Sequence, residues 1–114
     1  MKKFRNSPTV LAGLKFDSQG EARRWGELGL LERAGAINCL QRQVVFVLAP
    51  KVSITGELRA RPALRYIADF TYQEHGASIV EDWKSAPTRK LPAFRLKQHL
   101  MKSVLGLDIR LTGS

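Results

Sequence analysis

Helical spacing of apolar residues marks the first element of the chain. Trp25 and Leu28 fall on one face of a segment that ends near residue 34, just before a glycine. Ser18 is followed three residues later by Glu21, the spacing of a capping box, in which the two side chains satisfy free backbone N–H groups at a helix start. The pattern therefore predicts a helix over residues 18–34 with one face turned toward a core.

Three segments with strand-forming composition follow this helix. Residues 40–48 are rich in valine, and residues 64–72 and 77–84 carry aromatic and β-branched side chains. Residues 49–63 contain two prolines and one glycine and predict a loop or an irregular hairpin connection. The Glu74-His75-Gly76 segment has the length and the glycine of a hairpin turn, so the last two strands are expected to pair with each other.

The last part of the chain predicts a second helix and a short strand. Residues 92–105 carry apolar positions at helical spacing after an initial proline, which suits the first turn of a helix, and residues 107–111 are strand-like. The order helix, three strands, helix, strand predicts an α/β fold with a mixed sheet flanked by helices. A chain of 114 residues is expected to form one domain, residues 1–114. Residues 1–15 are expected to be a loose basic arm that starts with Lys2, Lys3 and Arg5.

The charge balance indicates a polyanionic partner. The chain has 19 Lys and Arg against 10 Asp and Glu, a net charge of +9, which favours DNA or RNA. No acid occurs between Asp82 and Asp108, and a second basic group, Arg59, Arg61 and Arg65, precedes the 64–72 strand. The residues predicted to contact nucleic-acid phosphates are Arg89, Lys90, Arg95, Lys97 and Lys102.

Other compositional features indicate the cellular compartment and exclude some classes of protein. The single cysteine, Cys39, excludes an intramolecular disulfide, and no Cys/His group has the spacing of a zinc site. The longest apolar run is far shorter than the roughly 20 residues that span a bilayer, and no apolar segment follows the basic start as in a secretory signal. A cytoplasmic protein with no membrane partner is expected.

Two aspartates stand where strands are predicted, although aspartate is a poor strand former. Asp69 lies within the 64–72 strand, and Asp82 shares one strand face with Lys84 because side chains alternate. Pairing of the two strands around Gly76 would bring Asp69 opposite the neighbourhood of Asp82. The alternative is that Asp69 faces solvent and that Asp82 and Lys84 form an ordinary ion pair.

Paired carboxylates repel each other, and a divalent cation between them removes the repulsion. Oxygen ligands suit Mg²⁺, for which Mn²⁺ can substitute. A neighbouring lysine can orient or deprotonate a water or stabilise charge on a phosphate. The arrangement therefore predicts metal-dependent hydrolysis of a phosphodiester.

The chain resembles the PD-(D/E)XK nucleases, and in particular a small family of phage and prophage proteins. Four blocks in order carry the resemblance over about residues 14–105, with a basic helix near residues 94–97 completing it. Ala68 stands where proline gives the motif its name, a position that varies among members. The blocks are Phe16-Asp17-Ser18-Gln19-Gly20-Glu21-Ala22-Arg23-Arg24, Leu30-Leu31-Glu32-Arg33-Ala34-Gly35-Ala36-Ile37, Tyr66-Ile67-Ala68-Asp69-Phe70 and Val80-Glu81-Asp82-Trp83-Lys84.

The resemblance implies a restriction-endonuclease-like core of order α-β-β-β-α-β. It implies metal ligation by Asp69, Asp82 and the Trp83 carbonyl, with Lys84 as the catalytic lysine. Glu21 would be the additional acid of the first helix, an assignment that competes with a purely capping role. Glu81, on the opposite strand face from Asp82, is expected to be structural or exposed.

The expected function is that of a Mg²⁺-dependent DNA endonuclease from a phage or prophage, acting in the bacterial host, such as a Holliday junction or branched-DNA resolvase. A homodimer is compatible with this, since cutting two strands needs two sites in symmetry. The alternatives are a nucleic-acid-binding or recruitment module of the same fold without turnover and an RNA-processing nuclease.

Overall fold

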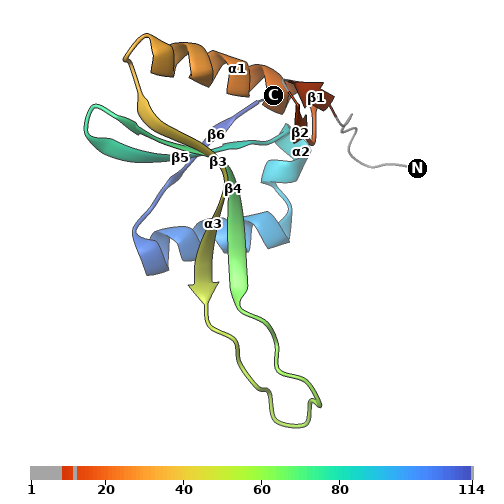
Figure 1. Ribbon diagram of the computed structural model, residues 1–114. Helices are drawn as coiled ribbons and strands as arrows, with labels where there is room; N and C mark the ends of the chain where they lie inside the picture. The colour runs from red at the N-terminus through yellow and green to blue at the C-terminus, as the bar shows by residue number, and fades with distance from the viewer. Residues whose placement is uncertain (1–8, 12, 114) are drawn as a thin grey trace.

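A four-stranded sheet lies between two helices in the computed structural model, which describes residues 9–11 and 13–113 (Figure 1). A small two-stranded sheet precedes this core. The elements are β1 (Thr9–Leu11), β2 (Leu14–Phe16), α1 (Gln19–Arg33), β3 (Asn38–Ala49), β4 (Leu64–Glu74), β5 (Ala77–Trp83), α2 (Ala86–Arg89), α3 (Pro92–Leu105) and β6 (Ile109–Thr112).

The two long helices begin and end at residues that suit those positions. At the start of α1, the Ser18 hydroxyl accepts a hydrogen bond from the Glu21 backbone N–H at 3.1 Å. At the end of α3, Gly106 adopts a left-handed conformation with φ of 71°, and its N–H donates to the Lys102 carbonyl. Both helices of the sequence prediction are confirmed.

The sheet has the order β3-β4-β5-β6 and is mixed. β4 is antiparallel to β3 and β5, whereas β6 is parallel to β5. His75 and Gly76 form a two-residue turn between the paired residues Glu74 and Ala77, and both turn residues have positive φ, as the favoured hairpin turns require. A mixed α/β fold with helices flanking the sheet is therefore confirmed.

Each sheet face packs against a different helix. Phe70 and Tyr72 pack with Leu28 of α1, whereas Tyr66 and Ala68 pack in a cluster that includes Phe94 and Met101 of α3.

The alternation of faces along β4 shifts between Ala68 and Phe70, because these residues two apart pack on opposite faces. In β3 the facing residue is Gln43, which has a φ of 55° and is missing from the ladder between the pairs Arg42–Phe70 and Val44–Ala68. Local irregularities of this kind re-aim side chains in a sheet. Asp69 stands at the irregular position.

The expectation of a loose arm over residues 1–15 is wrong for the described residues of that segment. β1 and β2 form an antiparallel hairpin around Gly13, whose φ of 81° suits the turn. Phe16 at its end is buried, with the Arg42 guanidinium 4.3 Å above its ring. The burial of Phe16 anchors the segment to the core. Residues 1–8 and 12 lie outside the described residues, and so do Lys2, Lys3 and Arg5.

The connection between β5 and α3, residues 85–91, contains the short helix α2, which the Ser85 side chain caps. Residues 50–63, between β3 and β4, are a connection that projects away from the body of the molecule (Figure 1). Within the described residues, no helix is long and apolar enough to cross a membrane.

Close packing at Gly20 makes a prediction about stability. A Cβ at Gly20 would overlap the Trp83 indole, whereas a Cβ at Gly26, in the same helix, would meet no atom within 4 Å. Gly20→Ala should therefore lower the free energy of unfolding by about 1–3 kcal/mol. Gly26→Ala should raise it by about 0.5–1 kcal/mol through helix propensity alone. Urea denaturation of both variants checks this, and equal effects would contradict the packing of α1 on Trp83.

Candidate acidic site

Asp69 and Asp82 meet across the β4–β5 hairpin. The pair Phe70–Glu81 sets a register that places Asp69 opposite Asp82, and both side chains are buried. The Asp69 N–H donates to Asp82 Oδ1 at 3.2 Å, and the Trp83 N–H donates to Asp69 Oδ2 at 2.8 Å. Each carboxyl group is thus held by the backbone of the other strand, with one oxygen engaged and one left for other partners.

Lys84 provides the nearest positive charge. Its Nζ lies 3.1 Å from Asp82 Oδ2 and 5.2 Å from the centroid of the Phe94 ring in α3. The Lys84 side chain is partly exposed, so its ammonium group lies between the buried Asp82 and the protein surface. The shared face of Asp82 and Lys84 follows from strand alternation.

The backbone geometry also directs the carbonyl of Trp83. The Lys84 N–H donates to the Thr112 carbonyl of the neighbouring strand β6 at 2.8 Å. Because the chain has no cis peptide bond among its described residues, the Trp83 carbonyl of the same peptide group points the opposite way. β4 lies on that side of β5, so this carbonyl is directed toward the strand that carries Asp69.

α1 adds Glu21 to the two aspartates. The Glu21 side chain is buried, and its Oε2 lies 3.8 Å from Arg42 Nη2 without a hydrogen-bond donor among the described residues. Burial, followed by the charge of Asp17, raises the pKa of Glu21, while a hydrogen bond with Asp69 lowers it. The capping hydrogen bond uses the Glu21 backbone, so the cap leaves its carboxyl group available to the cluster.

Crowding of the acids favours retention of a proton. Burial raises the pKa of Asp69 to about 9, and the hydrogen bond and charge of Asp82 and the charge of Glu21 act in the same direction. The Trp83 N–H opposes the shift by stabilising the carboxylate. In the metal-free protein the Asp69 carboxyl therefore favours its protonated form well above the pH at which an ordinary aspartate loses its proton.

Behind the site, a partly buried ion pair ties α1 to β5. Glu81 is fully buried and accepts from Arg24 Nε at 2.6 Å and Nη2 at 2.9 Å. The Tyr72 hydroxyl donates to the same carboxylate at 2.6 Å, and the Thr112 hydroxyl at 3.2 Å. Glu81 is thus structural, one of the two roles expected from the sequence, and the Arg24 contact holds α1 one turn after Glu21.

Two residues at the site were missed by the sequence prediction. Tyr66 has a buried hydroxyl with no hydrogen-bond partner in the described part of the chain, and burial followed by the charge of Asp82 raises its pKa. Arg42 reaches Glu21 and donates to the Lys15 carbonyl at 2.7 Å. Tyr66 lies in the same motif as Asp69, which was an available signal, whereas no local pattern connects Arg42 to Glu21.

The donor set matches a hard divalent cation in chemistry. Asp82 Oδ2 and Glu21 Oε2 are buried atoms without hydrogen bonds among the described residues, and anionic oxygens are the ligands that Mg²⁺ and Mn²⁺ prefer. Across residues 9–11 and 13–113, no group of three or more His, Cys, Asp or Glu side chains is arranged to hold a metal ion. A cation held by two carboxylates and the Trp83 carbonyl would require only two acidic side chains, fewer than such a group of three.

The residues predicted to contact nucleic acid differ in their exposure to solvent and in their partners. Lys90 and Arg95 are exposed and line a hollow of about 450 Å³ with His99. Lys102 is exposed but paired with Asp108 at 2.8 Å.

The other two predicted contacts are less accessible. Lys97 is half-buried, on the helix side that carries the buried Phe94 and Met101. Arg89 donates to the Lys84 and Gly113 carbonyls at 3.2 and 3.0 Å, which gives it a structural role in holding the end of β5.

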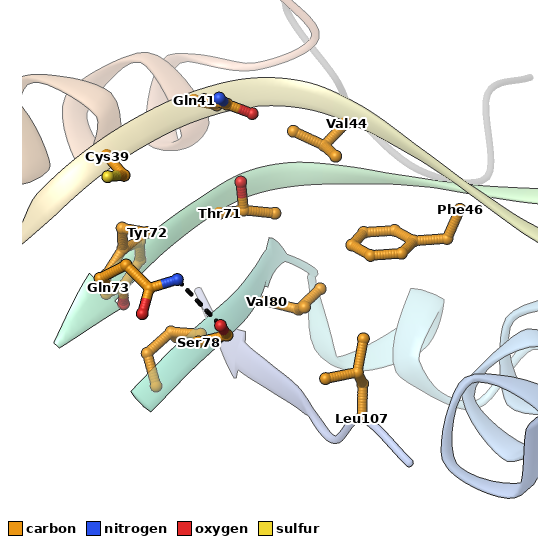
Figure 2. Close-up of a pocket in the computed structure, with 11 residues that line it drawn as sticks. Cys39, Gln41, Val44, Phe46, Thr71, Tyr72, Gln73, Ser78, Val80 and Leu107 are labelled. Carbon is orange, nitrogen blue, oxygen red and sulfur yellow. Dashed lines mark hydrogen bonds between the residues drawn. The ribbon is translucent and has the colours of Figure 1, made fainter. Parts of the chain in front are cut away.

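A separate groove of about 310 Å³ lies on the sheet (Figure 2). Val44, Phe46, Val80 and Leu107 contribute apolar atoms, and Gln73 donates to Ser78 at its edge. The three acids are not among its lining residues, so the groove is distinct from the acidic site.

Fold and site define a class, a mixed α/β protein with three neighbouring buried carboxyl groups and an adjacent lysine. A family model described as "Protein of unknown function (DUF1064)" matches residues 1–112, so the chain belongs to the DUF1064 family. Comparison with curated proteins and with solved structures gave no match.

The raised pKa of Asp69 predicts a pH dependence of stability. Between its ordinary value of 3.8 and about 9, the folded chain keeps a proton that the unfolded chain has lost, so stability falls as pH rises through this range. Asp69→Asn should flatten the fall, and Asp108→Asn, at an exposed site, should not. Melting temperatures at pH 5, 7 and 9 in EDTA measure this. A wild-type slope in Asp69→Asn would contradict the assignment.

Proposed function

We propose that this protein is a Mg²⁺-dependent DNA endonuclease with the restriction-endonuclease-like fold of the PD-(D/E)XK enzymes. The observation that carries the proposal is the buried Asp69–Asp82 pair, with Lys84 Nζ 3.1 Å from Asp82. A pure scaffold gains nothing from burying adjacent carboxyl groups, because their desolvation and repulsion destabilise the fold. Groups with strongly perturbed pKa values gather at functional sites.

Each residue has a distinct role in the proposed reaction. Asp69, Asp82 and the Trp83 carbonyl would hold the cation, with Glu21 as a further ligand or as an acceptor that orients water. When bound, Mg²⁺ supplies a Lewis acid for the phosphate and lowers the pKa of water. Lys84 holds its ammonium beside Asp82, where it can stabilise negative charge on the phosphate.

DNA is the proposed substrate, and branched DNA such as a Holliday junction is the preferred form. The net charge of +9 and the exposed Lys90 and Arg95 support phosphate contacts. A short chain has little room for elements that read a long base sequence, so recognition of DNA structure fits better. A homodimer would supply two sites for two cuts.

The second candidate is a nucleic-acid-binding or recruitment module of the same fold without turnover. The observation that favours it is the absence, among the described residues, of a group of three or more metal-binding side chains arranged around one point. The two candidates share the fold and the charge and differ in whether Asp69, Asp82 and Lys84 turn over a substrate.

Cleavage assays decide between the two candidates. Wild-type protein should cut at least one of linear, nicked and four-way-junction DNA with Mg²⁺ or Mn²⁺, and none in EDTA. Asp69→Asn should lower the rate by at least a hundredfold while DNA binding in EDTA stays within about threefold. Lys84→Ala should lose most of the turnover but keep cation binding.

Asp108→Asn, which changes an exposed acid, is the matched control and should cleave at the wild-type rate. The same duplexes made of RNA test the RNA-processing alternative. Absence of cleavage of any DNA by the wild type, with DNA binding intact, would favour the binding module. Full turnover by Asp69→Asn would remove this residue from the site.

A further inference from the structure

The connection between β3 and β4, here called the β3–β4 arm (residues 50–63), is an ordered projection. Val52 and Arg61 pair through two backbone hydrogen bonds of 3.0 and 2.7 Å, and the Glu57 N–H donates to the Ile54 carbonyl. The Arg61 guanidinium adds two hydrogen bonds to Glu57, at 3.1 and 2.6 Å. These contacts give the arm a defined hairpin shape.

Apolar side chains at the end of the arm are left in water. Leu58 is fully exposed and Ile54 is exposed as well, and Val52, which pairs with Arg61 below the turn, is also exposed. Isolated exposed apolar residues are common on protein surfaces, but a projecting tip that gathers several of them marks an interaction site when its surroundings are charged.

The stem of the arm carries positive charge. Residues 50–65, which are the arm and the first two residues of β4, contain four cations and one acid, and the acid, Glu57, is paired with Arg61. Lys51, Arg59 and Arg65 have no acidic partner among the described residues, and all three are exposed. A basic stem with an apolar tip complements a partner that presents phosphates and exposed bases together.

The arm extends from the strand that carries the acidic site. Asp69 is five residues from Leu64, the first residue of β4, which is about 17 Å along a strand. Leu58 lies six residues farther, at most about 20 Å of extended chain. At 3.4 Å for each base-pair step, the arm can reach a DNA site within about 10 steps of a phosphate at Asp69.

We propose that the β3–β4 arm, together with Arg65 at the start of β4, is a second DNA-contacting element, in which Lys51, Arg59 and Arg65 bind phosphates and Ile54 and Leu58 enter the stack of bases at a branch point. Apolar wedges of Leu and Ile are known to separate base steps in this way. Branch points are the preferred place because their bases are already partly unstacked. This proposal rests on the proposed function in taking DNA as the ligand, and it names branched DNA as the substrate class.

The test uses a forked DNA duplex with 2-aminopurine beside the branch point, in EDTA so that no cleavage occurs. Saturating wild-type protein should raise the fluorescence of the probe, because unstacking relieves its quenching. Ile54→Ala combined with Leu58→Ala should abolish the rise and weaken binding to the fork at least fivefold, while affinity for plain duplex stays within twofold. Leu30→Ala combined with Leu31→Ala, two exposed apolar residues of α1, is the matched control and should behave as the wild type.

The charged stem has its own readout. Arg59→Ala should reduce the slope of log affinity against log salt by about 0.9, the value for one lost phosphate contact. Arg33→Ala removes an exposed cation at the end of α1 and should leave the slope unchanged. An unchanged slope in Arg59→Ala would remove this residue from the phosphate-binding stem.

Several outcomes would overturn the proposal. The wild type could give no fluorescence rise, or the tip variant could retain the rise. A change in the sedimentation of the DNA-free protein on altering the tip would assign the tip to contact between copies of the chain. Failure of the proposed function is distinguishable from these outcomes. If the wild type gives the fluorescence rise but does not cleave with Mg²⁺, the role of the arm is supported and the endonuclease function is contradicted. If the wild type cleaves while the tip variant retains the rise, only the role of the arm is contradicted.

Discussion

Burial of neighbouring acidic groups at one point is the constraint around which this structure is built. Asp69 and Asp82 are withdrawn from water side by side, with Glu21 close enough to influence the charge of Asp69. Burying a carboxylate is unfavourable unless hydrogen bonds or opposite charges compensate for the loss of water. Here two backbone N–H groups, the Lys84 ammonium and a retained proton supply that compensation. We take this cost in stability as support for the proposed cation site.

The surrounding scaffold serves to bring three elements to that point. The two-residue turn after Glu74 sets the register that makes Asp69 and Asp82 neighbours. The irregularity opposite Gln43 changes the face of β4 at Asp69. The partly buried Arg24–Glu81 pair holds α1 against β5, and removal of Arg24 would leave the fully buried Glu81 carboxylate without its positive partner. Each of these contacts lies outside the acidic site and determines where its carboxyl groups are.

Much of the core was predictable from the sequence because its signals are local. Ser18 and Gly106 mark helix ends, and the turn at Gly76 predicted a hairpin that brings Asp69 opposite the neighbourhood of Asp82. The sequence left open whether Asp69 faces solvent, and the structure shows it buried beside Asp82. Contacts between distant segments could not be derived in this way. Arg24 finds Glu81 57 residues away.

Other features lacked any reliable pattern. The hairpin of residues 9–16 depends on burial of Phe16 against residues far along the chain, and Gln43 has a positive φ that no sequence rule assigns to glutamine. Arg89 was predicted as a phosphate contact because it is basic, but its hydrogen bonds go to backbone carbonyls of this chain. Charge along a sequence indicates a partner without showing which cations are free to meet it.

The proposed function requires that the buried acids bind a divalent cation. The most direct test of this requirement is calorimetric titration of the protein with Mn²⁺ at pH 7.5 in buffers of different ionisation enthalpy, which counts the protons released on binding. The wild type should release about one proton, because the cation must displace the proton held at Asp69. Asp69→Asn should bind more weakly and release close to none. Binding of Mn²⁺ without proton release, or with the same release in Asp69→Asn, would contradict the account.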